Sequence, residues 1–180
     1  MKKIFLILII FIIQFSSLVS KEPKLEEILS GLKGPWSLSF IDKSKILVTE
    51  KQGNFFLADL KNKNLSKINH NLNILVDGQG GLLEVLYSND NVFVSYSENR
   101  GKGKSSTSVA RASFNKKELK FKNIFRSEPP INSGYHFGSR LVIKDNLLYI
   151  TAGERGEGMI AQDPTKHPGS IIRIHLDGKI

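Results

Sequence analysis

The sequence predicts an all-β protein built as a β-propeller, and three observations support this prediction. Short runs rich in β-branched and aromatic residues recur along the chain, separated by Asn, Asp and Gly. The runs form three successive copies of one order: strand, tight polar turn, strand, loop, strand. No convincing amphipathic helix follows the first twenty residues. A β-sandwich or an open meander would share the first observation, but the repeated order favours propeller blades.

Nine runs have the length and composition of strands. In chain order they are residues 36–40, 46–50, 55–59, 82–87, 92–97, 108–114, 140–143, 147–151 and 170–176. Two further candidates, 72–76 and 119–125, lie between the copies and would give the blades a fourth strand. Because propellers close with about 4 to 8 blades and this chain supplies about three, we expect the front part of a longer protein.

The first twenty residues have the layout of a secretory signal peptide. Lys2 and Lys3 precede an apolar run at residues 4–13, and a more polar stretch of small residues ends near Ser20. A retained anchor is less favoured because a membrane helix needs roughly 20 apolar residues. We expect a cleaved signal helix at residues 1–20, a partial propeller at 21–180, a periplasmic or secreted protein, and no stable membrane insertion after cleavage.

Composition narrows the classes of function. With no cysteine, the chain can form neither disulfides nor a thiolate metal site. The formal net charge is +9, but the lysines are scattered, and the only dense cluster, at residues 100–104, is typical of a loop tip. We therefore expect no nucleic-acid partner. Motifs for phosphate loops, HExxH zinc sites, serine elbows and EF-hands do not occur.

Three glycine-containing loops hold the candidate site residues. Gln79 lies among glycines in the first loop, and the second places His136 just before an apolar run. An imidazole with an ordinary pKa of about 6.5 is a plausible proton acceptor at neutral pH. The third loop contains Glu154 and Arg155. Other readings stay open: an ordinary glycine turn at Gln79, a structural His136, and a surface ion pair between Glu154 and Arg155.

Further motifs extend along almost the whole chain after residue 33. They are GPW at 34–36, VTEKQG at 48–53, GQGGLLEV at 78–85, VSYS at 94–97, HFGSRL at 136–141, LYITAGERG at 148–156, AQD at 161–163, GSIIRI at 169–174 and LDG at 176–178. Taken together, these collinear segments resemble the soluble glucose/sorbosone dehydrogenase family, the pyrroloquinoline quinone (PQQ)-dependent aldose sugar dehydrogenases. The resemblance implies a six-bladed propeller, of which this chain is the first half.

The resemblance also implies roles for individual residues. His136 matches the general base, which takes the proton of the anomeric hydroxyl while hydride passes to PQQ, so that an aldose becomes a lactone. Gln79 matches a residue that lines the sugar and quinone pocket, and Arg155 falls near another position that contacts the cofactor. Tyr135 stands at a substrate-binding position where relatives carry Asp or Asn. Ser139 and Glu154 replace the more usual Gly and Asp.

The resemblance finally implies a cofactor set and partners. Ca²⁺ binds PQQ in the family, through ligands expected in the second half, so we assign no metal ligand here. The partners would be an aldose and a soluble or membrane electron acceptor. We expect the 180-residue chain alone to be inactive. The alternative from another class is a secreted, non-catalytic propeller that serves as a binding or interaction module, because propellers host many functions.

Overall fold

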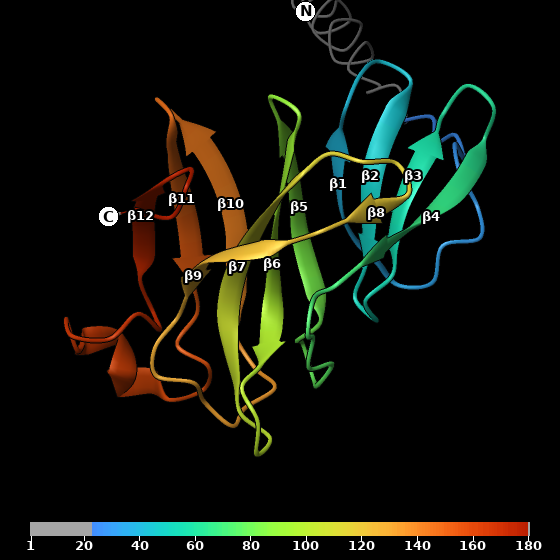
Figure 1. Ribbon diagram of the computed structural model, residues 1–180. Helices are drawn as coiled ribbons and strands as arrows, with labels where there is room; N and C mark the ends of the chain where they lie inside the picture. Colours follow the sequence, from blue (N-terminus) through green and yellow to red (C-terminus); the bar gives the residue numbers. More distant parts are fainter. Residues whose placement is uncertain (1–22, 180) are drawn as a thin grey trace, which may run out of the picture.

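The computed structural model describes residues 23–179, and in this range the chain is almost entirely β-strand. The strands form three main sheets that stand side by side, as the blades of a propeller do (Figure 1). The expected signal peptide at residues 1–20 lies outside the described residues. Within residues 23–179, no helix has the length and apolar character needed to cross a bilayer.

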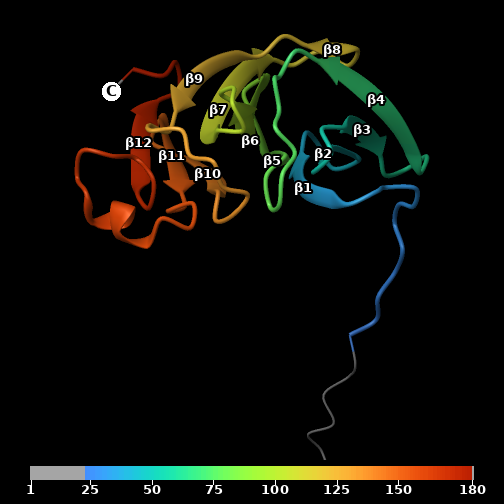
Figure 2. The same cartoon turned by 90° about the horizontal axis from the view of Figure 1, so that it is seen from below.

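Each blade is a meander of antiparallel strands. Blade 1 contains β1 (Pro35–Phe40), β2 (Lys45–Glu50), β3 (Phe55–Asp59) and β4 (Asn64–His70). Blade 2 contains β5 (Leu82–Ser88), β6 (Asn91–Asn99), β7 (Ser105–Ser113) and β9 (Lys122–Arg126). Blade 3 contains β10 (Gly138–Lys144), β11 (Leu147–Ala152) and β12 (Ile171–His175). The blades fan around an arc, with β1, β5 and β10 towards its inner side (Figure 2).

A short strap joins blade 2 to blade 1. Between β7 and β9 the chain forms β8 (Glu118–Leu119), which pairs in parallel with the end of β4. Leu119 and Phe121 are buried there, and the Phe121 ring packs at 6.3 Å from that of Phe55. The outer edge of blade 1 is therefore covered by residues from the neighbouring blade.

The nine predicted strands are confirmed, and their ends shift by at most three residues. The candidate at 72–76 is wrong: that segment holds only an isolated bridge between Ile74 and Glu98. The fourth strand of blade 1 is instead Asn64–His70, an outer strand that is mostly exposed. Its side chains carry little hydrophobic signal because only its inner face meets the core. The candidate at 119–125 corresponds to β8 and β9.

Two hairpins are closed by the tight turns that the sequence predicts. Asn89 and Asp90 have φ of 48° and 58°, and Asp145 and Asn146 have φ of 52° and 59°. Asn and Asp tolerate this left-handed region, and two such residues in succession form the turn that matches the twist of the flanking strands. These tips lie at the opposite end of the blades from the loops that contain His136 (Figure 1).

The hydrophobic core lies between the blades, and alternating residues of β6 pack into the core on the two sides of blade 2. On β6, Val92 and Val94 face blade 1, where they join a cluster with Leu47. Phe93 points the other way and packs in a cluster with Leu148 of blade 3. This period of two is what a strand buried on both faces requires. Each blade is therefore stabilised by its neighbours.

Hydroxyl groups hold neighbouring blades in a repeated register. Thr49 in β2 donates to the carbonyl oxygen of Leu83 at 2.6 Å, and the equivalent Ser95 in β6 donates to that of Ser139 at 2.6 Å. Both acceptors lie at a bulge, in the first strand of the next blade. These bulges lie near the start of β5 and of β10, so the two hydrogen bonds also hold in place the loops that enter these strands.

A buried carboxylate organises the polar part of blade 2. Glu98 is 8% exposed and accepts hydrogen bonds from Ser108 at 2.7 Å, Asn123 at 2.9 Å and Arg126 at 2.8 Å. Burial opposes its ionisation, but the hydrogen bonds from Arg126 and Ser108 outweigh burial and lower the pKa of Glu98. Burial, followed by the charge of Glu98, raises the pKa of the nearby Tyr96 to about 12.

Glu98→Ala is expected to lower the free energy of unfolding by about 2 kcal/mol at pH 7. Because the folded-state pKa of Glu98 lies below that of an unfolded glutamate, about 4.3, its contribution is present above pH 4.3 and disappears as pH falls. Urea unfolding at pH 7 and pH 3 measures this, with the exposed Glu118→Ala as control. A stability difference that persists undiminished at pH 3 would contradict the role of the charge.

Candidate active site

Three loops meet at one end of the blades, at the lower edge in Figure 1. Residues 77–81 lead into β5, residues 132–137 lead into β10, and residues 153–157 follow β11. The first and second loops are joined through Gln79. Its backbone N–H donates to the carbonyl of Gly134 at 2.7 Å, and its side-chain oxygen accepts from the backbone N–H of His136 at 2.9 Å. The Gln79 amide nitrogen makes no hydrogen bond to a described residue.

The His136 ring is hydrogen bonded to a carboxylate of the third loop. Its Nδ1 lies against Oε1 of Glu154, and the same oxygen accepts from the N–H of Gly156 at 3.2 Å. A carboxylate can only accept, so Nδ1 bears the proton and the lone pair of the neutral ring is on Nε2. Half of the imidazole side chain is exposed. Nε2 is thus an acceptor that the described residues leave open to a ligand.

Glu154 keeps its negative charge over a wide range of pH. The hydrogen bond from His136 holds the pKa of this carboxyl below its usual range. The pair therefore resembles the carboxylate–histidine arrangement in which an anion fixes the tautomer of a base. The sequence allowed a surface ion pair between Glu154 and Arg155, but Glu154 pairs with His136 instead.

Glu154→Gln is expected to lower the activity supported by His136 by about 10- to 100-fold, the usual effect of losing a group that orients a functional histidine. A neutral amide can either accept or donate a hydrogen bond, so it no longer fixes the ring in the tautomer with the proton on Nδ1. Nitrogen-15 NMR of the His136 ring should show more of the Nε2–H tautomer. Glu157→Gln, an exposed change three residues away, serves as control. Unchanged ring shifts in Glu154→Gln would contradict this assignment.

Tyr135 presents an aromatic surface beside the base. It is 61% exposed, and its ring centre lies 6.1 Å from that of His136. A tyrosine ring offers an apolar face and a polar hydroxyl at low conformational cost. The structure thus brings together Tyr135, His136 and Gln79, three of the four site residues that the sequence predicts.

Arg155, the fourth, lies inside the protein. It is 2% exposed and donates to the carbonyls of Tyr135 at 2.9 Å and Ser105 at 3.1 Å, to the Ser105 hydroxyl at 3.0 Å, and to the carbonyl of Ser133. Its guanidinium also stacks on the ring of Phe137 at 3.6 Å. The cofactor contact predicted for Arg155 stays a prediction, with one of its five N–H groups bonded to no described residue.

Other polar residues are used elsewhere. Arg140 pairs with Glu84. Asp163 accepts from Thr165 in its own loop, an interaction that, with the nearby Lys166, lowers the pKa of Asp163 to about 2. His175 lies exposed on β12.

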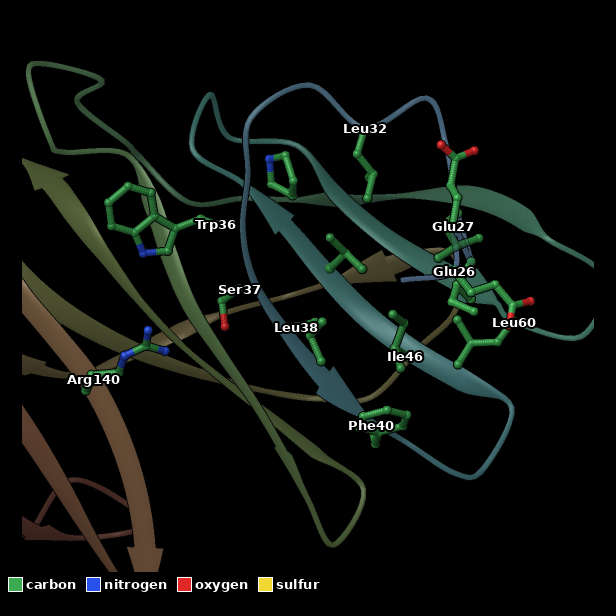
Figure 3. Close-up of a pocket in the computed structure, with 14 residues that line it drawn as sticks. Glu26, Glu27, Leu32, Trp36, Ser37, Leu38, Phe40, Ile46, Leu60 and Arg140 are labelled. Atoms are coloured by element: carbon green, nitrogen blue, oxygen red, sulfur yellow. The ribbon is translucent and has the colours of Figure 1, made fainter. Parts of the chain in front are cut away.

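A separate apolar hollow of about 770 Å³ lies on the open face of blade 1 (Figure 3). Trp36, Leu38 and Phe40 of β1 line it together with residues 26–32, while Arg140 reaches its edge. The GPW motif at 34–36 therefore belongs to this face, and the hollow includes neither His136 nor Gln79. Its walls are mostly apolar and contain no histidine, in contrast to the three loops.

The interactions of Glu154 and Arg155 were missed from the sequence. Ser105 anchors Arg155 although it lies 50 residues earlier, and nothing in its local pattern marks it. The partner of His136 lies 18 residues later. The acidic residue at position 154, Glu where the family more usually has Asp, was the one signal in the sequence that could have identified this partner.

Fold and loops together define a class of protein: a β-propeller that presents a carboxylate-paired histidine among polar and aromatic groups at one end of its blades. The chain is similar to the aldose sugar dehydrogenase YliI of Escherichia coli, with 30% identity over 165 residues. That match covers 86% of this chain and 44% of the relative. A glucose dehydrogenase of known crystal structure is 32% identical, with a TM-score of 0.82 over 88% of this chain and 49% of that one.

The PQQ-bound form of an aldose sugar dehydrogenase from Streptomyces coelicolor shares the fold, with a TM-score of 0.74 at 22% identity. This likeness covers 86% of the chain and 48% of that structure. The family model for glucose/sorbosone dehydrogenase matches residues 32–180. The chain belongs to this family, which confirms the resemblance and the β-propeller fold. It spans about half the length of the relatives that it matches.

Proposed function

We propose that the protein is a PQQ-dependent aldose sugar dehydrogenase in which His136 is the general base. The observation that carries the proposal is the His136–Glu154 pair, which leaves Nε2 as a half-exposed acceptor beside Gln79 and Tyr135. The carbon that bears a hydroxyl group gives up hydride readily only while the hydroxyl proton is being removed. The anomeric hydroxyl of an aldose would donate to Nε2, and the resulting imidazolium would be stabilised by Glu154.

Substrate contacts follow from the same loops. The Gln79 amide nitrogen can donate to a sugar hydroxyl or to a quinone oxygen while its oxygen holds the His136 backbone. The exposed Tyr135 ring can pack against the C–H face of a sugar. The aldose would lose its hydroxyl proton to His136 and a hydride from C1, and a lactone would form.

The amide nitrogen of Gln79, which bonds to no described residue, supports a contact with one edge of a quinone cofactor. Gln79 would contact PQQ, with Arg155 as the second predicted contact, and bound PQQ would supply the two-electron acceptor. Calcium is a different case. Among residues 23–179 no group of three acidic, His or Cys side chains is placed to hold a metal ion. We assign Ca²⁺ no ligand in this chain, and no step proposed for His136 depends on one.

Localisation and partners form part of the same proposal. The N-terminal sequence supports cleavage of residues 1–20 and a periplasmic or secreted protein. Electrons would pass from the reduced cofactor to a soluble or membrane acceptor. The family and the similarity to sugar dehydrogenases support sugars as substrates.

Aldose-dependent reduction of a redox dye tests this function. The whole protein that carries this sequence is purified, supplied with PQQ and Ca²⁺, and assayed with a panel of aldoses. We expect dye reduction that requires both PQQ and sugar, with lactone as the product. Sugar binding by calorimetry without dye reduction would overturn the proposal and favour a non-catalytic binding module.

A further inference from the structure

Arg155 is unusually placed for an arginine. It is 2% exposed, although arginine is rarely buried fully without a partner charge. Its bonds go to carbonyl and hydroxyl oxygens rather than to a carboxylate. Burial lowers the pKa of Arg155 to about 10, against the opposing effect of Asp77. Because it is costly to bury a charged group, this placement indicates that the guanidinium makes hydrogen bonds that a neutral side chain would not make as well.

The contacts of Arg155 lie on both sides of His136. Before the histidine, its N–H groups hold the carbonyls of Ser133 and Tyr135. After the histidine, its guanidinium covers the ring of Phe137 at 3.6 Å. His136 itself has φ of 48°, a left-handed conformation that is uncommon for residues other than glycine.

The guanidinium of Arg155 is also bonded to a strand of the neighbouring blade. Ser105, which accepts from both terminal nitrogens of Arg155, begins β7 in blade 2 and is buried. The arginine therefore ties a loop of blade 3 to a strand of blade 2. Its neighbour Glu154 binds the imidazole itself. The dipeptide Glu154-Arg155 thus contacts both the ring of the histidine and the peptide carbonyl that directly precedes it.

We propose that Arg155 is a positioning residue: it clamps the backbone just before His136 to blade 2 and thereby keeps Nδ1 on Glu154 and Nε2 directed outward. The consequence for turnover rests on the proposed role of His136 as the base. The positioning of the ring does not rest on that role, because the conformation and tautomer of the ring can be measured in the absence of cofactor and sugar.

Arg155→Lys separates positioning from simple packing. Lysine keeps the charge and the aliphatic stem but loses the planar fork that reaches three residues. Arg111→Lys is the matched control, since Arg111 also lies over an aromatic ring, that of Phe93 at 5.7 Å, and donates to a carbonyl far from the loops. Ser105→Ala, which removes a single acceptor of the clamp, is the milder variant if Arg155→Lys does not fold.

Nitrogen-15 NMR of the His136 ring, in the whole protein that carries this sequence and without cofactor or sugar, gives the direct readout. In Arg155→Lys we expect the His136 ring signals to show a second tautomer or exchange broadening, while Arg111→Lys leaves them as in wild type. Ser105→Ala should shift them in the same direction to a smaller extent. His136 signals that stay unchanged in both Arg155→Lys and Ser105→Ala, whatever the loss of stability, would overturn the positioning role.

Kinetics of the whole protein provide the second readout. If the proposed function holds, Arg155→Lys should lower kcat by about 10- to 100-fold, since a misplacement near 1 Å can have this effect, with little change in KM. A purely structural role predicts a reduced amount of active protein with unchanged kcat per folded molecule. Absence of dye reduction in wild type would refute the function, whereas the NMR result would still decide the role of Arg155.

Discussion

His136→Asn is expected to lower aldose-dependent dye reduction by about 10²- to 10⁴-fold, the contribution of a positioned general base. Asparagine suits this position because it tolerates the left-handed backbone that His136 adopts at φ of 48°. Its short amide can replace Nδ1 as a donor towards Glu154, but it has no equivalent of Nε2. The substitution therefore removes the proton acceptor with little disturbance of the loop.

The rate should be measured with saturating PQQ and Ca²⁺, on the whole protein that carries this sequence. His175→Asn is the control, because His175 is exposed on β12 and lies outside the three loops. Thermal unfolding of both variants should stay close to wild type. Equal turnover by His136→Asn and wild type would exclude His136 as the base, even if the protein proved to be a sugar dehydrogenase.

Among substitutions that add one methyl group to the three loops, Gly153→Ala is expected to be the most disruptive. A Cβ at this glycine would lie closer than 3.0 Å to the carbonyl oxygen and carbon of His136. Both groups are backbone, and the Gly153 N–H is bonded to the carbonyl of Phe137 at 3.1 Å, so neither can rotate away. We expect a loss of about 3 kcal/mol in the free energy of unfolding, the upper part of the usual range for overpacking.

The same substitution should also separate His136 from Glu154, which follows the glycine directly. Urea unfolding measures the loss of stability, and the nitrogen-15 shifts of the His136 ring measure the broken pair. Gly101→Ala is the comparison: its Cβ meets nothing within 4 Å, but its φ of 78° is strained for alanine. That strain should cost only about 1 kcal/mol. Wild-type stability in Gly153→Ala would contradict the tight approach of these loops.

Close contacts of this kind explain why glycines recur in the loop motifs of this sequence. A Cβ on Gly78 would lie closer than 3.0 Å to the carbonyl oxygen of Gly134, and a Cβ on Gly138 would lie equally close to backbone atoms of Gly153 and Thr151. A glycine-rich turn was a possible reading of these segments, and turn formation accounts for part of the pattern. The remainder reflects three loops that pack backbone against backbone, which brings Gln79, His136 and Glu154 within reach of one another.

Strand positions could be predicted because they depend on near neighbours in the chain. A continuous apolar run such as Val92, Phe93 and Val94 predicts a strand buried on both faces, and paired Asn and Asp residues predict a left-handed turn. The outer strand β4 escaped prediction for the complementary reason. Its exposed residues need only backbone pairing with β3, and backbone pairing leaves no trace in side-chain chemistry.

His136, Gln79 and Tyr135 were found as candidates because the loop motifs around them are unusual and collinear with those of the family. Local sequence was also enough for the blade repeat and the hairpin turns. The pairing of His136 with Glu154, and the burial of Arg155 against Ser105, needed the folded chain. These contacts join residues 18 and 50 positions apart, and their geometry depends on how adjacent blades pack. Interactions between distant segments are selected by the shape of the whole core, so no short window of sequence contains them.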